Sequence, residues 1–105
     1  MNQYDVYWVD LNPTLGSEIN KIRPAVIISP NEMNAHLNTL IIAPMTSTIK
    51  SYPYRVNCSL GEKKASIALD QIRTVDKIRL QSHIGRLSGV NIQNVKSILK
   101  EMLVE

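Results

Sequence analysis

The chain has 105 residues, which suits one compact domain with its own core, and we expect that domain to span residues 1–105. Hydrophobic residues make up 44% of the chain and charged residues 20%, and no apolar run is long enough to cross a bilayer, so we expect no membrane contact. The net charge of +3 and the pI near 9.2 permit a polyanionic partner but are too small to establish one.

The first part of the chain predicts a strand followed by a long polar loop. Residues 1–5 show no basic segment followed by an apolar one, so we expect a cytoplasmic protein and not an exported one. Val6–Leu11 is rich in β-branched and aromatic residues and predicts a strand, which Asn12 and Pro13 end. Thr14–Arg23 is polar and predicts a loop whose length is typical of functional loops.

Two apolar segments in the middle of the chain predict the strands at the centre of the core. Ala25–Ser29 lies between two prolines and predicts a buried strand. Asn31–Asn38 has room for a short helical turn, and Thr39–Ala43 predicts another interior strand. Pro44 is expected to end that strand, which makes Pro44–Thr46 a turn.

The second half predicts further short strands. Tyr54–Leu60 alternates apolar and polar residues, as a half-buried strand does, and Gly61–Lys64 predicts an exposed turn. Its apolar face is expected to contain Tyr54, Val56, Cys58 and Leu60. Ser66–Leu69, Ile72–Val75 and His83–Leu87 predict three more strands, so the sheet is expected to be mostly antiparallel.

The last part of the chain predicts an amphipathic helix that packs on the sheet, with Asn91 as its N-cap. Apolar residues recur there at helical spacing: Ile92, Val95, Ile98, Leu99, Met102 and Leu103. Many short strands with one terminal helix predict a mainly β fold, a small and partly open barrel.

Cysteine and histidine usage gives little support for a metal or redox site. Cys58 is the only cysteine and is expected to fill core space. His36 and His83 lie far apart without partners at metal-ligand spacing, which also weakens a paired-histidine ribonuclease. We therefore expect no metal and no cofactor.

Several segments together point to one family. They are Asp5–Thr14, Gly16–Glu18, Arg23–Pro30, Pro44–Ser47, Leu69–Lys77 and the pair Arg79 and Leu80. This pattern covers nearly the whole chain and closely resembles the MazF/PemK toxins of type II toxin-antitoxin systems. The resemblance implies an SH3-like small barrel of the MazF/PemK/CcdB type, a homodimer, and cleavage of single-stranded RNA or mRNA at short sequences. It also implies a cognate antitoxin with an acidic, partly disordered tail, through which alone the toxin would contact DNA.

The resemblance implies a small catalytic set. RNA carries its own nucleophile, the 2′-hydroxyl, so a protein can cleave it without metal by positioning the phosphate, moving a proton and stabilising charge. Arg23 matches the catalytic arginine of the family and Thr46 the catalytic threonine. Without the match, Arg23 would be interpreted as a surface residue and Thr46 as a turn residue.

Two carboxylates compete as the general base of this reaction. Glu18 lies five positions before Arg23, as in family members where this glutamate is the candidate, although an exposed loop carboxylate is the plainer interpretation. A related toxin branch has a catalytic acidic residue at the position of Asp70, with an arginine two residues earlier. This chain has Ala68 there, so Asp70 is equally a residue that supports the site or reads a base.

Other polar residues are expected to contact the RNA. They are Ser17, Lys21, Ser47, Thr48, Lys50 and Gln71, of which Gln71 offers both a donor and an acceptor to a base edge. Tyr52 and Tyr54 are candidates for stacking but are more often packing residues, and Trp8 is expected to be structural. Further basic residues fit either an RNA path or a solvated surface: Arg55, Arg73, Lys77 and Arg79.

The leading hypothesis is therefore a metal-independent endoribonuclease that leaves a 2′,3′-cyclic phosphate and a 5′-hydroxyl end. Two rivals stay open at this point because the fold alone does not establish cleavage. One is a non-enzymatic toxin of the same fold that binds a topoisomerase, and the other is a plain RNA-binding module. Cleavage of RNA in excess chelator separates the first hypothesis from both.

Overall fold

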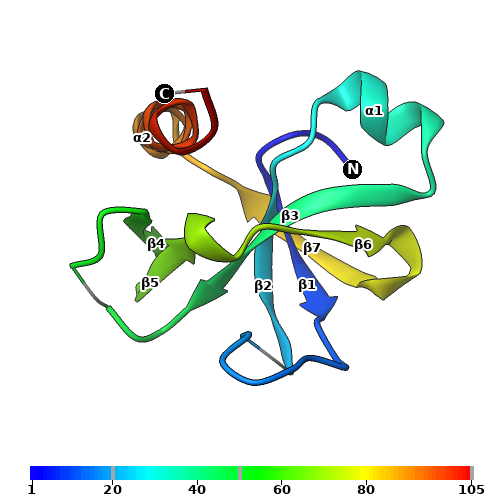
Figure 1. The fold of residues 1–105 in the computed structure, drawn as a ribbon, viewed down its shortest axis with the longest axis horizontal. Helices are drawn as coiled ribbons and strands as arrows, with labels where there is room; N and C mark the ends of the chain where they lie inside the picture. The colour runs from blue at the N-terminus through cyan, green and yellow to red at the C-terminus, as the bar shows by residue number, and fades with distance from the viewer. Residues whose placement is uncertain (20, 50, 105) are drawn as a thin grey trace.

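The computed structural model describes residues 1–19, 21–49 and 51–104. Within them, seven antiparallel strands form a strongly curved sheet that a C-terminal helix covers at one end (Figure 1). The strands are β1 (Asp5–Asp10), β2 (Ile22–Ile27), β3 (Thr39–Thr46), β4 (Arg55–Leu60), β5 (Lys63–Ala68), β6 (Arg73–Asp76) and β7 (Leu80–Arg86). The helices are α1 (Asn31–His36) and α2 (Gly89–Leu99), with 3-10 turns η1 (Leu69–Gln71) and η2 (Lys77–Arg79) and a π-helical end η3 (Lys100–Val104). A mainly β fold with a C-terminal helix is thus confirmed.

Strand β3 organises the sheet because it pairs with three other strands. It pairs with β6 over Thr39–Ile42, with β2 over Ile42–Pro44 and with β5 at Met45 and Thr46. The resulting order is β4-β5-β3-β2-β1-β7, with β6 on β3. In Figure 1 the β4–β5 hairpin stands to the left of β1, β2 and β7, and β3 crosses between them.

Pro24 was expected to precede β2 and Pro44 to end β3, and both expectations are wrong. Pro44 lies inside β3, at the point where one edge of that strand changes partner from β6 to β5, so its missing N–H removes no bond to either. Pro24 lies inside β2 and faces Trp8 of β1, one residue before β2 begins to pair with β3. The predicted loop therefore ends before Ile22, and the predicted turn Pro44–Thr46 is strand.

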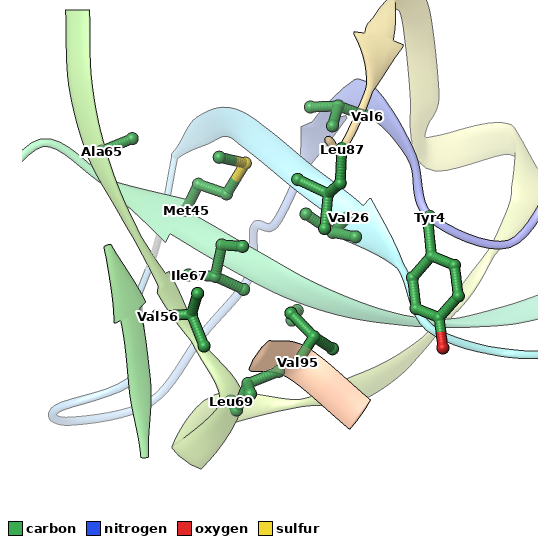
Figure 2. Packing of buried hydrophobic residues seen from close by; sticks show 11 residues of the cluster. Tyr4, Val6, Val26, Met45, Val56, Ala65, Ile67, Leu69, Leu87 and Val95 are labelled. Carbon is green, nitrogen blue, oxygen red and sulfur yellow. The ribbon is translucent and has the colours of Figure 1, made fainter. Parts of the chain in front are cut away.

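The core lies on both faces of the sheet because neighbouring strand residues point in opposite directions. Val26 belongs to a cluster with Met45, Ile67 and the helix residue Val95, as Figure 2 shows. Ala25 and Ile27, the neighbours of Val26, belong to a second cluster with Val9, Leu11, Leu40, Ile42 and Val75. The expectation that β2 and β3 form the centre of the core is confirmed.

Several element ends differ from the prediction. Helix α2 begins at Gly89, and its N-cap is Ser88, whose hydroxyl accepts a hydrogen bond from the N–H of Asn91 at 3.2 Å. Asn91 is thus a first-turn residue and not the predicted cap. Only two residues separate β4 from β5, because Gly61 turns the chain with a φ of 60° and β5 already begins at Lys63.

Strands β6 and β7 are also shifted from the predicted ranges, to Arg73–Asp76 and Leu80–Arg86. On the apolar face of β4, Val56 is buried and Tyr54 is exposed, and Leu103 of the predicted helix stripe is exposed as well. Both side chains lie where the packed surface ends, and the spacing of apolar residues does not predict where that end is. In the part of the chain that the structure describes, no helix is long and apolar enough to cross a membrane.

Candidate functional site

A cleft of about 500 Å³, here called the strand-end cleft, opens where β2 begins and β3 ends. The β4–β5 turn and outward-facing residues of β1 and β7 form its other walls. Arg23, Thr46 and Ser47 line it together, so the structure brings three of the predicted site residues into one place.

The strand ladder positions Arg23 and Thr46. Ala25 of β2 pairs with Pro44 of β3, and the same register continued by two residues places Arg23 opposite Thr46. Arg23 is half-buried, as is Thr46, whose hydroxyl oxygen accepts the N–H of Thr48 at 3.1 Å. Because that oxygen accepts the main-chain bond, the hydroxyl hydrogen of Thr46 can be donated into the cleft.

The strand-end cleft also holds residues that the sequence did not single out. Lys63 and Lys64 from the start of β5 line it and add positive charge to the cleft that holds Arg23. Trp8 lines it as well and is 40% exposed, although it was expected to be structural. The alternation of β1 explains this, because Trp8 continues the face of buried Val6 past the end of the core.

A second cleft of about 450 Å³, here called the loop cleft, holds the remaining predicted catalytic residues. The β1–β2 loop contributes Ser17 and Glu18 to it, and η1 contributes Asp70 and Gln71. Pro44 lines the loop cleft and the next residue of β3 lines the strand-end cleft, so the two clefts flank one stretch of that strand. The pattern of Glu18, Arg23 and Thr46 expected from the sequence is therefore divided between two neighbouring clefts.

Asp70 is engaged in a two-pronged ion pair with Arg55 of β4. The distance from Arg55 Nε to Asp70 Oδ1 is 2.7 Å, and that from Nη2 to Oδ2 is 3.1 Å. These hydrogen bonds lower the pKa of the Asp70 carboxyl, which disfavours its protonated form. The related toxin branch has an arginine two residues before its acidic residue, where this chain has Ala68. Arg55 is the strand partner of Ala68, so here an arginine reaches Asp70 from the neighbouring strand. The ring of Tyr52 lies 5.2 Å from the Arg55 guanidinium carbon.

Glu18 and Gln71 take part in the local structure of the loop. The carboxylate of Glu18 accepts the N–H of Leu15 at 2.6 Å, and the N–H of Glu18 donates to the carbonyl of Leu15 at 3.2 Å. Gln71 accepts the N–H of Ile19 through its side-chain oxygen at 2.8 Å. Glu18 is exposed, and Gln71 is half-buried.

The other residues expected to contact RNA are spread over the surface near the clefts. Thr48 follows Ser47 at the end of β3 and is exposed. Lys21 is exposed just before β2, with a φ of 71°, and its N–H donates to the side chain of Asn12 at 3.1 Å. Lys50 lies outside the described residues.

Three basic residues of the segment after η1 donate hydrogen bonds to main-chain carbonyls, a structural role that the sequence did not indicate. Arg73 donates to the carbonyl of Leu11 at 3.0 Å. Arg79 donates to the carbonyls of Asp10 and Asn12, and Lys77 donates to that of Asn34. These side chains fix the start of the β1–β2 loop and helix α1, so they are engaged with the protein and not only with solvent.

Cys58 and the histidines lie away from both clefts. Cys58 packs against the first core cluster, as expected, and burial raises the pKa of its thiol. His83 contacts the ring of Tyr7 edge-on, with 5.0 Å between centroids, and lies 3.9 Å from the Asp5 carboxylate. Among residues 1–19, 21–49 and 51–104, no group of three His, Cys, Asp or Glu side chains is arranged to hold a metal ion.

Comparison with known proteins gives a consistent result. A family model described as the PemK-like, MazF-like toxin of type II toxin-antitoxin systems matches residues 2–103. A protein named endoribonuclease MazF from Staphylococcus saprophyticus is 34% identical over 105 aligned residues, which cover 94% of this chain and 88% of that protein.

Solved structures share the fold. The crystal structure of MazF from Deinococcus radiodurans superposes with a TM-score of 0.87 at 24% identity, covering 100% of this chain and 97% of that one. An endoribonuclease from a mycobacterial species, solved in complex with its cognate antitoxin, gives a TM-score of 0.84 at 21% identity, covering 99% and 95%. The small barrel of this type that the resemblance implied is confirmed.

Proposed function

The chain belongs to the PemK-like, MazF-like toxins of type II toxin-antitoxin systems and is an endoribonuclease, and from this we propose that it cleaves single-stranded RNA at the strand-end cleft without a metal ion. The observation that carries the proposal is the meeting of Arg23 and Thr46 in one cleft beside Lys63 and Lys64. Three cations and a hydroxyl donor suit a phosphodiester, whose negative charge grows during cleavage.

In the proposed reaction, the 2′-oxygen of a ribose attacks the neighbouring phosphorus and the bond from phosphorus to the 5′-oxygen breaks. A base takes the proton of the 2′-hydroxyl, and the leaving 5′-oxygen gains a proton, which gives a 2′,3′-cyclic phosphate and a 5′-hydroxyl end. Arg23 stabilises the charge on the nonbridging oxygens, since its guanidinium is permanently charged and forked. Thr46 donates a hydrogen bond to one of those oxygens or orients the 2′-hydroxyl.

Glu18 is the proposed proton acceptor, in preference to Asp70. Both oxygens of Asp70 hold Arg55, and its lowered pKa makes it a weak base. Glu18 is exposed at the rim of the adjoining cleft, on a loop that leads directly into Arg23. Asp70 is instead proposed to hold η1 and its neighbour Gln71 in place.

The RNA strand is proposed to run across both clefts. Trp8 offers an exposed aromatic face on which an unpaired base can stack, while Lys63 and Lys64 contact phosphates. In the loop cleft, Ser17 presents a polar group to a base edge, whereas the side-chain oxygen of Gln71 is engaged with the N–H of Ile19. The remaining proposed contacts are Lys21, Ser47, Thr48 and Lys50.

The proposed partners follow from membership of the family. A cognate antitoxin with an acidic tail would compete with RNA for the cations of the strand-end cleft, and the toxin would meet DNA only through that antitoxin. The whole chain is proposed to act as one domain in a homodimer, in the cytoplasm, where mRNA is found. A mass measured by light scattering that stays monomeric at all concentrations would contradict the dimer.

Incubation of the purified protein with a long unstructured RNA in excess chelator tests the reaction. We expect fragments whose 5′ ends are hydroxyls and whose 3′ ends are cyclic phosphates, mapped by sequencing of the ends. RNA that stays bound and intact across varied sequences would contradict the proposal, as would expression that damages DNA while RNA remains stable.

A further inference from the structure

The β1–β2 loop is fastened to the barrel by side chains from one later segment of the chain. Arg73 and Arg79 hold carbonyls at the start of the loop, before its polar part. Gln71 holds the other end, because its side-chain oxygen accepts the N–H of Ile19 across 52 positions of sequence. The loop is therefore tied at both ends to residues 71–79.

The contact made by Gln71 lies next to the proposed proton acceptor. Ile19 directly follows Glu18, and its side chain packs against the second core cluster. Two hydrogen bonds join Glu18 to Leu15 of the same loop, and they shape the loop without tying it to the barrel. Ile19 is anchored by two contacts, one with Gln71 and one with the core, while Lys21 closes the loop by hydrogen bonds with Asn12 and Leu11.

We propose that Gln71 is a positioning residue for Glu18, which it serves by holding Ile19. The inference rests on the proposed function, since it takes Glu18 as the base. Displacement of a reacting group by about 1 Å can reduce a rate about 100-fold, so one hydrogen bond beside the base can affect the rate without contacting the RNA. The ion pair of Arg55 and Asp70 supports this arrangement by fixing the residue before Gln71.

The first experiment replaces Gln71→Leu, which removes the acceptor and keeps the size of the side chain. We expect kcat to fall about 10-fold, the loss that corresponds to one hydrogen bond, while KM and the cleavage sequence stay unchanged. The amide of Ile19 should exchange its hydrogen faster. Gln81→Leu, the same change at an exposed position of β7, is the matched control and should leave kcat and exchange unchanged.

A rescue variant separates positioning from base reading. Gln71→Glu keeps an acceptor oxygen but adds a negative charge that repels RNA. We expect kcat at saturating RNA to recover most of the loss while KM rises. A Gln71→Leu variant that changes the cleavage sequence, or a Gln71→Glu variant as slow as Gln71→Leu, would show that Gln71 acts on the RNA directly.

Combining Gln71→Leu with Glu18→Gln gives the decisive result. If Gln71 acts through Glu18, the double variant should cleave as slowly as Glu18→Gln alone. A further 10-fold loss would overturn the inference, and so would a faster Gln71→Leu variant, because the contact would then hold Glu18 away from the substrate. Glu18→Gln with full activity would remove the base assignment itself; a slow Glu18→Gln with a fully active Gln71→Leu would remove only the role of Gln71.

Discussion

The strand-end cleft and the loop cleft flank the same strand but differ in the polar groups that line them. In the loop cleft, Asp70 forms an ion pair with Arg55, Gln71 accepts a hydrogen bond from the N–H of Ile19, and Arg73 donates one to the carbonyl of Leu11. The strand-end cleft instead collects Arg23, Lys63 and Lys64 around a threonine hydroxyl. The difference indicates that the strand-end cleft suits an anion, whereas the contacts in the loop cleft hold the loop that carries Glu18 in shape.

Replacement of Arg23 should have the largest effect and is the strongest test of this division. We expect Arg23→Ala to lower kcat by roughly 10²–10³, the loss that follows removal of one preorganised donor to a developing oxyanion. Arg23→Lys should recover only part of it, because an ammonium keeps the charge but lacks the forked geometry. Cleavage rates of a defined RNA measure both. Thermal unfolding should change little, and a fully active Arg23→Ala would move the phosphate out of this cleft.

Thr46 tests the hydroxyl separately from the charge. Thr46→Val keeps the shape of the side chain and its β-branch, and we expect kcat to fall about 10- to 100-fold, as for one hydrogen bond to a charged group. Thr46→Ser keeps the hydroxyl and is the matched control, with activity near that of the wild type. Equal losses in the two variants would assign the effect to packing at the end of β3 and not to the hydroxyl.

Much of the strand-end cleft could be predicted because it follows from local pattern. Arg23 and Thr46 lie at opposite ends of neighbouring apolar strands, and antiparallel pairing brings such ends together. Trp8 could have been found by the same alternation, since Val6 and Trp8 share a face, but its aromatic character suggested core packing. The predictions at Pro24 and Pro44 are wrong because proline ends a strand only where the N–H that it lacks would have had a strand partner.

The loop cleft could not be predicted in the same way because its contacts join distant residues. Arg55 meets Asp70 only because β4 and β5 pair in one register and η1 then turns the chain back. Gln71 meets Ile19 only because β3 carries both β2 and β6 on its edges. The spacing of residues along the chain does not predict such contacts. Asp70 and Gln71, which the sequence offers as site residues, therefore already form hydrogen bonds within the folded chain.

The two lysines at the start of β5 sharpen the comparison through salt dependence. For single strands, each phosphate contact contributes a slope of about 0.7 to the fall of log affinity with log salt. We expect Lys63→Gln and Lys64→Gln each to reduce the slope by about that amount and to raise KM a few-fold while kcat stays the same. Lys96→Gln on the exposed side of α2 is the matched control. An unchanged slope in both lysine variants would place the RNA path elsewhere.

Asp70 should show the smallest effect on cleavage and a measurable one on stability. Because Arg55 lowers the pKa of the folded-state carboxyl, ionised Asp70 stabilises the fold above its unfolded-state pKa of about 3.9, and this contribution is lost as pH falls through the folded-state value. We expect Asp70→Asn to cost about 1 kcal/mol in unfolding free energy at neutral pH, a figure kept small because the Asp70 side chain is 35% exposed.

The difference in stability between Asp70→Asn and the wild type should shrink in acid, which denaturant unfolding at neutral pH and below pH 4 would measure.

The same variant compares Asp70 and Glu18 directly as candidates for the base. Asparagine keeps one acceptor oxygen for Arg55 but cannot take up a proton as a base, so a supporting residue predicts a loss of cleavage much smaller than that of Glu18→Gln. If Asp70→Asn instead abolished cleavage while remaining folded, the loop cleft would contain the base at Asp70, and its ion pair would have to open during the reaction.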